Sequence, residues 1–188
     1  MSDQSPTVLV VDDEQQVADA YALRLQMEYD DVQKAYGGEE ALASVDETVD
    51  VVLLDRRMPD YSGGEVLDQM RERGLGCSVI MVTAVDPDFD IVDMPFDDYL
   101  CKPVEKEALF DAIEQQLTER EYDDDMQKYF SVVSKIGVLE AQKPSYELEE
   151  SEEYLELKRR ADELREDLDQ TVQDFDDVES AFTTIDRN

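Results

Sequence analysis

The sequence predicts an α/β domain with a doubly wound, five-stranded parallel sheet, followed by an all-helical module. Short apolar runs alternate with helical patterns over the first 120 residues, which is typical of βαβ units. Six of the seven glycines lie before residue 77, and five of the six prolines lie at or before residue 103. The remaining chain has few breaks and carries a long apolar repeat at helical spacing, so it is predicted to be helical.

The five predicted strands are short and mostly apolar. Residues 7–11, 51–54 and 78–82 are runs rich in Val, Leu and Ile, as expected of strands that are buried on both faces. Residues 32–36 and 98–101 have a weaker pattern of the same kind. Strands of this length, separated by helical stretches, predict a parallel sheet covered by helices.

Five helical stretches separate or follow these strands, at residues 15–28, 38–45, 64–73, 89–94 and 104–120. In the last of them, apolar residues recur at steps of three and four from Val104 to Leu117, which predicts one buried face. The fourth stretch lies between Pro87 and Pro95, so we expect it to be short.

The second part is predicted to form a helical hairpin or a coiled coil. A helix is expected over residues 123–142, and a break over residues 143–145. One apolar stripe of this helix contains Tyr129, Val132, Ile136 and Leu139. From Tyr154 to Ile185 apolar residues recur in alternating steps of three and four, with one polar position. The members of this stripe are Tyr154, Leu157, Ala161, Leu164, Leu168, Thr171, Phe175, Val178, Phe182 and Ile185. It fits an antiparallel hairpin within the chain and pairing between two chains equally well.

The chain is strongly acidic, with 50 Asp and Glu against 17 Lys and Arg and a formal net charge of −33. The excess is spread over both parts, with −20 in residues 1–120 and −13 in residues 121–188. We interpret it as adaptation to a saline cytoplasm, since molar salt shortens the Debye length to about 3 Å and screens the self-repulsion. An ordinary acidic protein is the alternative. Either way, such a surface disfavours nucleic-acid binding.

This interpretation predicts that the melting temperature rises steeply between dilute and molar KCl, because screening removes repulsion among the carboxylates. Calorimetry across a salt series would measure the rise. A melting temperature that stays flat over the series would contradict the interpretation.

Several classes of site and location are disfavoured. The sequence has no His, which excludes Ser-His and Cys-His nucleophiles, imidazole bases and His-ligated metals. No apolar run is long enough to span a membrane, and residues 1–6 show no secretory signal, so we expect a cytoplasmic protein. Cys77 and Cys101 are expected at opposite ends of neighbouring strands, too far apart for a disulfide, and to be reduced thiols in the core.

Polar side chains follow four of the predicted strands. Asp12 and Asp13 follow the first, Asp55 the third, Thr83 and Ala84 the fourth, and Lys102 the fifth. In doubly wound sheets, sites form outside the carboxyl ends of the strands, so these residues are expected to converge. Three acids are weak evidence for a site in so acidic a chain. The single lysine directly after the fifth strand is stronger evidence for one.

Residues 5–120 resemble the receiver domain of two-component response regulators in the order and spacing of their motifs. The matching positions are Asp12-Asp13, Asp55, Met58-Pro59, Gly63, Thr83-Ala84, Tyr99 and Lys102-Pro103. The resemblance implies a flavodoxin-like sheet with strand order 2-1-3-4-5. It also implies a phosphoacceptor signalling protein that is not otherwise an enzyme, and a separate sensor histidine kinase as the phosphoryl donor.

The same resemblance assigns roles that fit these residue types. Asp12, Asp13, Asp55 and the backbone carbonyl of Arg57 would bind Mg²⁺, a cation that prefers oxygen ligands. Asp55 would accept the phosphoryl group, and Lys102 would pair with its oxygens.

The remaining roles concern the phosphoryl group's surroundings. Thr83 would donate a hydrogen bond to it, and Ala84 would leave room for it to approach. Thr83 and Tyr99 would act as the switch, moving towards the phosphorylated site. A preference for helix would explain Ala84 as well, and Tyr99 could instead be a plain surface tyrosine. A degenerate receiver that serves only as a scaffold is disfavoured, because the acidic pair, phosphoacceptor, threonine and lysine are all present.

Residues 121–188 resemble the HalX domain, a helical module found behind receivers in haloarchaea. The resemblance rests on Tyr129-Phe130, Leu139-Glu140, Tyr154-x-x-Leu157, Phe175 and Phe182. Two outputs compete: a module for protein interaction or homodimerisation with an unknown protein target, or a DNA-binding transcriptional regulator. The net charge of this part and the lack of a helix-turn-helix pattern favour the first.

Overall fold

The computed structural model describes residues 5–120, 122 and 124–171, which divide into two compact units. The first unit contains the described residues up to Val85 together with Met94–Leu117. The second contains Asp86–Asp93 and the described residues from Thr118 onwards. Within these ranges, no helix has the length and apolar character needed to cross a membrane.

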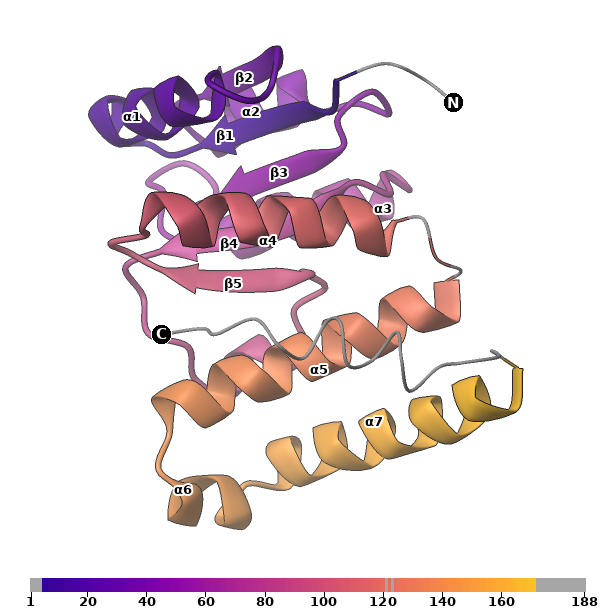
Figure 1. Ribbon diagram of the computed structural model, residues 1–188. Helices are drawn as coiled ribbons and strands as arrows, with labels where there is room; N and C mark the ends of the chain where they lie inside the picture. The colour runs from indigo at the N-terminus through magenta and orange to yellow at the C-terminus, as the bar shows by residue number, and fades with distance from the viewer. Residues whose placement is uncertain (1–4, 121, 123, 172–188) are drawn as a thin grey trace. The chain divides into compact units, whose positions relative to one another are not determined.

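The first unit is built on a five-stranded parallel sheet in the order β2-β1-β3-β4-β5 (Figure 1). Its strands are β1 (Thr7–Val11), β2 (Asp31–Ala35), β3 (Val51–Leu54), β4 (Ser78–Thr83) and β5 (Asp98–Cys101). The predicted fold class and strand order are confirmed, with β2 displaced by one residue and β4 one residue longer than predicted. The strand order reverses between β1 and β3, which is where ligand sites form in such sheets.

Helices cover both faces of this sheet (Figure 1). Successive residues of a strand point to opposite faces, so each buried strand contributes to two cores. Helices α1 (Gln15–Leu25) and α4 (Lys106–Glu119) pack against one face, and α2 (Gly38–Ser44) and α3 (Gly63–Glu72) lie on the other. The cluster under α1 and α4 contains the strand residues Val8, Val10, Val51, Leu53, Ile80 and Val82 and the helix residues Ala18, Leu25, Leu109 and Ile113.

The helix predicted over residues 89–94 is a single 3₁₀ turn, η1, at Phe89–Ile91. Asp88 caps it by accepting a hydrogen bond from the Phe89 amide. Pro87 and Pro95 explain why no longer helix forms, because Pro95 disfavours helical geometry at the residue before it and the interval is too short for several turns.

The second unit contains α5 (Asp124–Gln142), α6 (Ser145–Glu150) and α7 (Glu152–Thr171). Helices α5 and α7 run antiparallel and pack on each other within the chain (Figure 1). Near one end of the pair, the hydroxyl of Tyr154 donates a hydrogen bond of 2.5 Å to Glu140. Near the other, Leu168 packs with Met126, Tyr129 and Phe130. The predicted break after α5 is confirmed, and α6 was not predicted.

Most of the predicted apolar positions of this unit are buried, and Leu164 is half-buried. In α5 the buried positions are Tyr129, Val132, Ile136 and Leu139, and in α7 Tyr154, Leu157, Ala161 and Leu168. The positions from Phe175 to Ile185 lie outside the described residues.

Cys77 and Cys101 form no disulfide with each other, in agreement with the prediction. Cys77 is buried, whereas Cys101 is half-buried, so the prediction of a core position is correct for Cys77 only. Cys101 lies opposite Thr83 in the register of β4 and β5, while Cys77 precedes β4. The two residues therefore lie towards opposite ends of neighbouring strands, too far apart for a disulfide.

Candidate functional site

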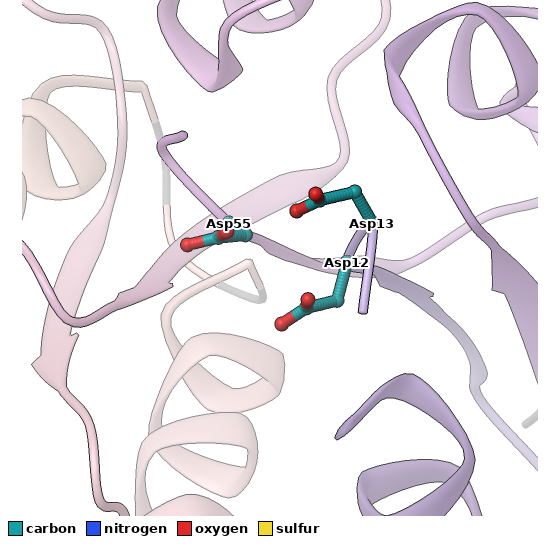
Figure 2. Close-up of side chains that lie close together, drawn as sticks. All are labelled: Asp12, Asp13 and Asp55. Atoms are coloured by element: carbon teal, nitrogen blue, oxygen red, sulfur yellow. The ribbon is translucent and has the colours of Figure 1, made fainter. Parts of the chain in front are cut away.

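Three carboxylates gather at the carboxyl ends of β1 and β3 (Figure 2). Hydrogen bonding between strands extends past the strand ends. The Asp12 amide donates a 3.1 Å hydrogen bond to the carbonyl of Ala35, and the Asp55 amide donates a 2.9 Å hydrogen bond to the carbonyl of Val11. This extension fixes Asp12 and Asp55 side by side. One carboxylate oxygen from each of Asp12, Asp13 and Asp55 lies within 4.8 Å of the others.

Lys102 brings a positive charge to this cluster. Its amide donates a 2.8 Å hydrogen bond to the carbonyl of Thr83, which extends the pairing of β4 and β5 in the same way. Its ammonium lies 2.5 Å from Asp12 Oδ2 and 3.7 Å from Asp55 Oδ1. The following peptide bond, to Pro103, is cis. A single lysine thus partly neutralises two buried carboxylates.

Burial and charge act in opposite directions on these groups. Burial raises the pKa of Asp55 above its ordinary value, and the nearby ammonium of Lys102 and the Thr83 hydroxyl offset only part of that rise. Burial would lower the pKa of Lys102, but the hydrogen bond to Asp12 and the charge of Asp55 outweigh it, so this pKa is raised. Lys102 therefore stays protonated beside the carboxylates.

The predicted switch residues lie next to the cluster. Thr83 is buried, its hydroxyl is hydrogen-bonded to Asp55, and it accepts a bond of 3.3 Å from the Val85 amide. Ala84 is exposed in a bend after β4 and is not helical, so helix preference does not explain it. Tyr99 is also buried, which excludes the surface-tyrosine alternative. Its hydroxyl donates a bond of 2.7 Å to the carbonyl of Val85.

The loop between β3 and α3 is fixed at several points, and it carries Arg57, which is exposed. The Gly63 amide donates a 2.9 Å hydrogen bond to the carbonyl of Arg56. Ser62 and Glu65 form a capping box at the start of α3. The loop that follows Asp55 is therefore held in one conformation.

Asp60 is a residue in this loop that sequence reasoning missed. Its carboxylate accepts hydrogen bonds from the amides of Gly38 and Glu39, at 3.1 and 2.8 Å, and so caps α2 from another segment of the chain. The only signal in the sequence is that α2 starts with glycines, which have no side chain to cap it.

These bonds, led by that from Glu39, lower the pKa of Asp60 to about 2. A lowered pKa stabilises the fold fully above the unfolded value of about 4, and the stabilisation is lost as the pH falls towards about 2. We expect Asp60→Ala to lower the free energy of unfolding by about 1 kcal/mol near neutral pH. The difference in the free energy of unfolding between Asp60→Ala and wild type should shrink on acidification. Urea unfolding in molar KCl at several pH values would measure it. A difference that is constant down to about pH 3 would contradict this role for Asp60.

The carboxylates of the three aspartates fit a hard divalent cation. Carboxylate oxygens are ligands that Mg²⁺ takes together with water and substrate phosphate. Asp12 and Asp55 are buried, and Asp13 is more accessible to solvent. Cations could therefore approach from the side of Asp13.

Residues 8–114 match the response regulator receiver domain. The chain belongs to the response regulator receiver family. Residues 118–184 match the HalX domain, so the receiver is followed by a HalX domain. Receiver domains are signalling phosphoacceptors that bind Mg²⁺ at an acidic pocket and are phosphorylated by sensor histidine kinases.

A curated relative from Haloferax volcanii, described as a “putative transcriptional regulator”, is 46% identical over 158 residues. The match covers 84% of this chain but only 27% of that protein, so this response regulator spans about a quarter of its relative's length.

Solved receiver structures are similar to the first unit. A CheY-like receiver from Methanospirillum hungatei has a TM-score of 0.58 and 27% identity, covering 63% of this chain and 98% of that one. TrrA of Thermotoga maritima, solved with Mg²⁺ and a beryllium fluoride, has a TM-score of 0.52 and 30% identity, covering 60% of this chain and 99% of that one.

Proposed function

We propose that this response regulator accepts a phosphoryl group on Asp55 from a sensor histidine kinase and relays the signal to its HalX domain. The observation that carries the proposal is the position of Lys102, whose ammonium reaches both Asp12 and Asp55. A lysine so placed partly neutralises the acidic cluster before phosphorylation and can pair with phosphoryl oxygens afterwards.

The residues divide the chemistry among them. An oxygen of Asp55 attacks phosphorus in line while the bond from phosphorus to the donor breaks, and an acyl phosphate forms. Asp12, Asp13, Asp55 and the carbonyl of Arg57 would hold Mg²⁺, which when bound offsets the negative charge of the incoming group. Lys102 pairs with one phosphoryl oxygen, and Thr83 donates a hydrogen bond to another.

The choice of Asp55 is tested by incubating the full chain with acetyl phosphate and Mg²⁺ in molar KCl, followed by intact mass. The wild type should gain one phosphoryl group, which hydroxylamine should remove because an acyl phosphate is a mixed anhydride. Asp55→Asn should gain none. Asp68→Asn, which alters an exposed aspartate on α3, is the matched control and should behave as wild type. Incorporation into Asp55→Asn at the wild-type level would refute the assignment.

We propose that the functional division falls near residue 120, with a receiver over residues 5–120 and an effector over 121–188. The effector would act by protein interaction, including homodimerisation through its helices. On α6 and α7, Tyr146 and Leu155 are 65% and 51% exposed, so apolar surface is available for such contacts. Light scattering on the same phosphorylated and unphosphorylated samples would detect dimerisation.

DNA binding is a second candidate, because the Haloferax volcanii relative is described as a transcriptional regulator. Two of the four cations of α7 argue against it, since Lys158 lies 3.6 Å from Glu140 and Arg159 forms an ion pair with Glu156. Cations that already have acidic partners in so negative a chain contribute little to phosphate binding. A phosphorylation-dependent gel shift that weakens with added salt would favour DNA binding instead.

A further inference from the structure

Residues 86–93, which we call the β4–β5 segment, lie inside the receiver in sequence but belong to the C-terminal unit in space. They leave the sheet after β4 and return before β5, and their only regular structure is the turn η1. The C-terminal unit is thus assembled from two separate stretches of chain, one of which begins three residues after Thr83 of the candidate switch.

Two lysines hold this segment to α5. Lys143, directly after α5, places its ammonium 2.7 Å from Asp88 and 4.9 Å from the centre of the Phe89 ring. Lys135, within α5, donates a hydrogen bond of 3.1 Å to the carbonyl of Val92. The side chain of Lys143 is only 17% exposed, and Lys135 is buried. Well-covered lysines that reach a neighbouring segment differ from the solvated lysines of an ordinary helix surface.

The start of the segment is bonded to the candidate switch. Val85, the residue before it, donates its amide hydrogen to Thr83 and accepts a hydrogen bond from Tyr99. Thr83 in turn is hydrogen-bonded to Asp55. A continuous series of bonds therefore leads from the candidate phosphoacceptor to Val85, the residue directly before the segment. At the other end, Arg71 donates a 3.2 Å hydrogen bond to the carbonyl of Pro95.

We propose that the β4–β5 segment is the mechanical link between receiver and HalX domain, and that Lys135 and Lys143 couple it to α5. This inference rests on the proposed phosphorylation of Asp55. A phosphoryl group there would compete for the Thr83 hydroxyl and so alter the bonds at Val85. Because Asp88 and Val92 follow Val85 within seven residues and are bonded to Lys143 and Lys135, displacement at Val85 is passed through them to α5.

Hydrogen exchange on the full chain tests this coupling. Samples with and without acetyl phosphate and Mg²⁺ are compared in molar KCl, and intact mass gives the phosphoryl content of each. In the wild type we expect phosphorylation to change deuterium uptake in peptides from α5. The double variant Lys135→Met/Lys143→Met should reduce that change at least about threefold while still incorporating phosphoryl, since methionine keeps an apolar stem and loses the ammonium.

A second test variant and two matched controls complete the experiment. Lys128→Met removes a lysine of α5 that pairs with Asp125 of the same helix, and it should leave the response as in wild type. Asp88→Asn, which leaves α5 unchanged, should weaken the response even if the double variant does not fold. Asp93→Asn, an exposed aspartate of the same segment, should not.

The possible failures are distinguishable. Absence of phosphoryl from the wild type would refute the proposed function and the coupling with it. Phosphorylation without any change in α5, or an equal change in wild type, Asp88→Asn and the double variant, would overturn the coupling while leaving the function intact.

Discussion

Replacing Lys102 by methionine should slow phosphoryl incorporation about 100-fold, because a charge placed to stabilise the transferring group is lost. It should also lower the free energy of unfolding by about 3 kcal/mol without Mg²⁺, since two buried carboxylates then face each other without their shared partner. Added Mg²⁺ should recover part of this loss by binding the folded state.

The measurements are a time course of intact mass and denaturant unfolding with and without Mg²⁺. Lys106→Met is the matched control. Lys106 lies on α4, its side chain is partly exposed, and its ammonium is 3.9 Å from a carboxylate oxygen of Glu28, which is a long ion pair. We expect it to change stability by about 0.5 kcal/mol or less. If Lys102→Met incorporated phosphoryl at the rate of this control, the role proposed for Lys102 would be wrong.

Replacing Gly63 by alanine should damage both stability and phosphorylation. The added Cβ would lie 2.3 Å from the carbonyl oxygen of Asp55 and 2.9 Å from the Cα of Arg56, both backbone atoms that cannot turn away. The loop must shift to admit it, at a cost of about 2–4 kcal/mol. Since the shift displaces Asp55 itself, phosphoryl incorporation should fall as well.

Gly64 provides the control at the next position of the same helix. A Cβ there would meet Met94 Cε at 3.6 Å and Ser62 Oγ at 3.9 Å, both ordinary contacts. Because alanine favours helix by about 1 kcal/mol over glycine, Gly64→Ala should be neutral or stabilising. Equal unfolding midpoints for Gly63→Ala and Gly64→Ala would show that the close approach to Asp55 is not needed.

The sequence was sufficient to predict the sheet, because strands buried on both faces are short apolar runs. Polar residues, glycines and prolines separate these runs clearly. It also predicted which side chains meet, since residues that follow parallel strands share one edge whatever the detailed packing. Asp12, Asp55, Thr83 and Lys102 are neighbours for this reason.

Contacts between segments that are distant in sequence could not be predicted. Asp60 caps α2 from another loop, and nothing in the sequence near Asp60 or near the start of α2 indicates that the two meet. The same holds for Lys143 and Asp88, which are 55 residues apart. The short α6 was missed because six residues are too few to show a helical period.

The discontinuous C-terminal unit has a practical consequence for protein engineering. Grafting a foreign receiver onto this HalX domain at a single junction near residue 118 would discard Asp88, Phe89 and Val92, to which Lys135 and Lys143 bind. A functional hybrid would need residues 86–93 transplanted along with the helices. Exchange of the receiver in this response regulator is therefore constrained by a short segment upstream of the boundary that the family matches define.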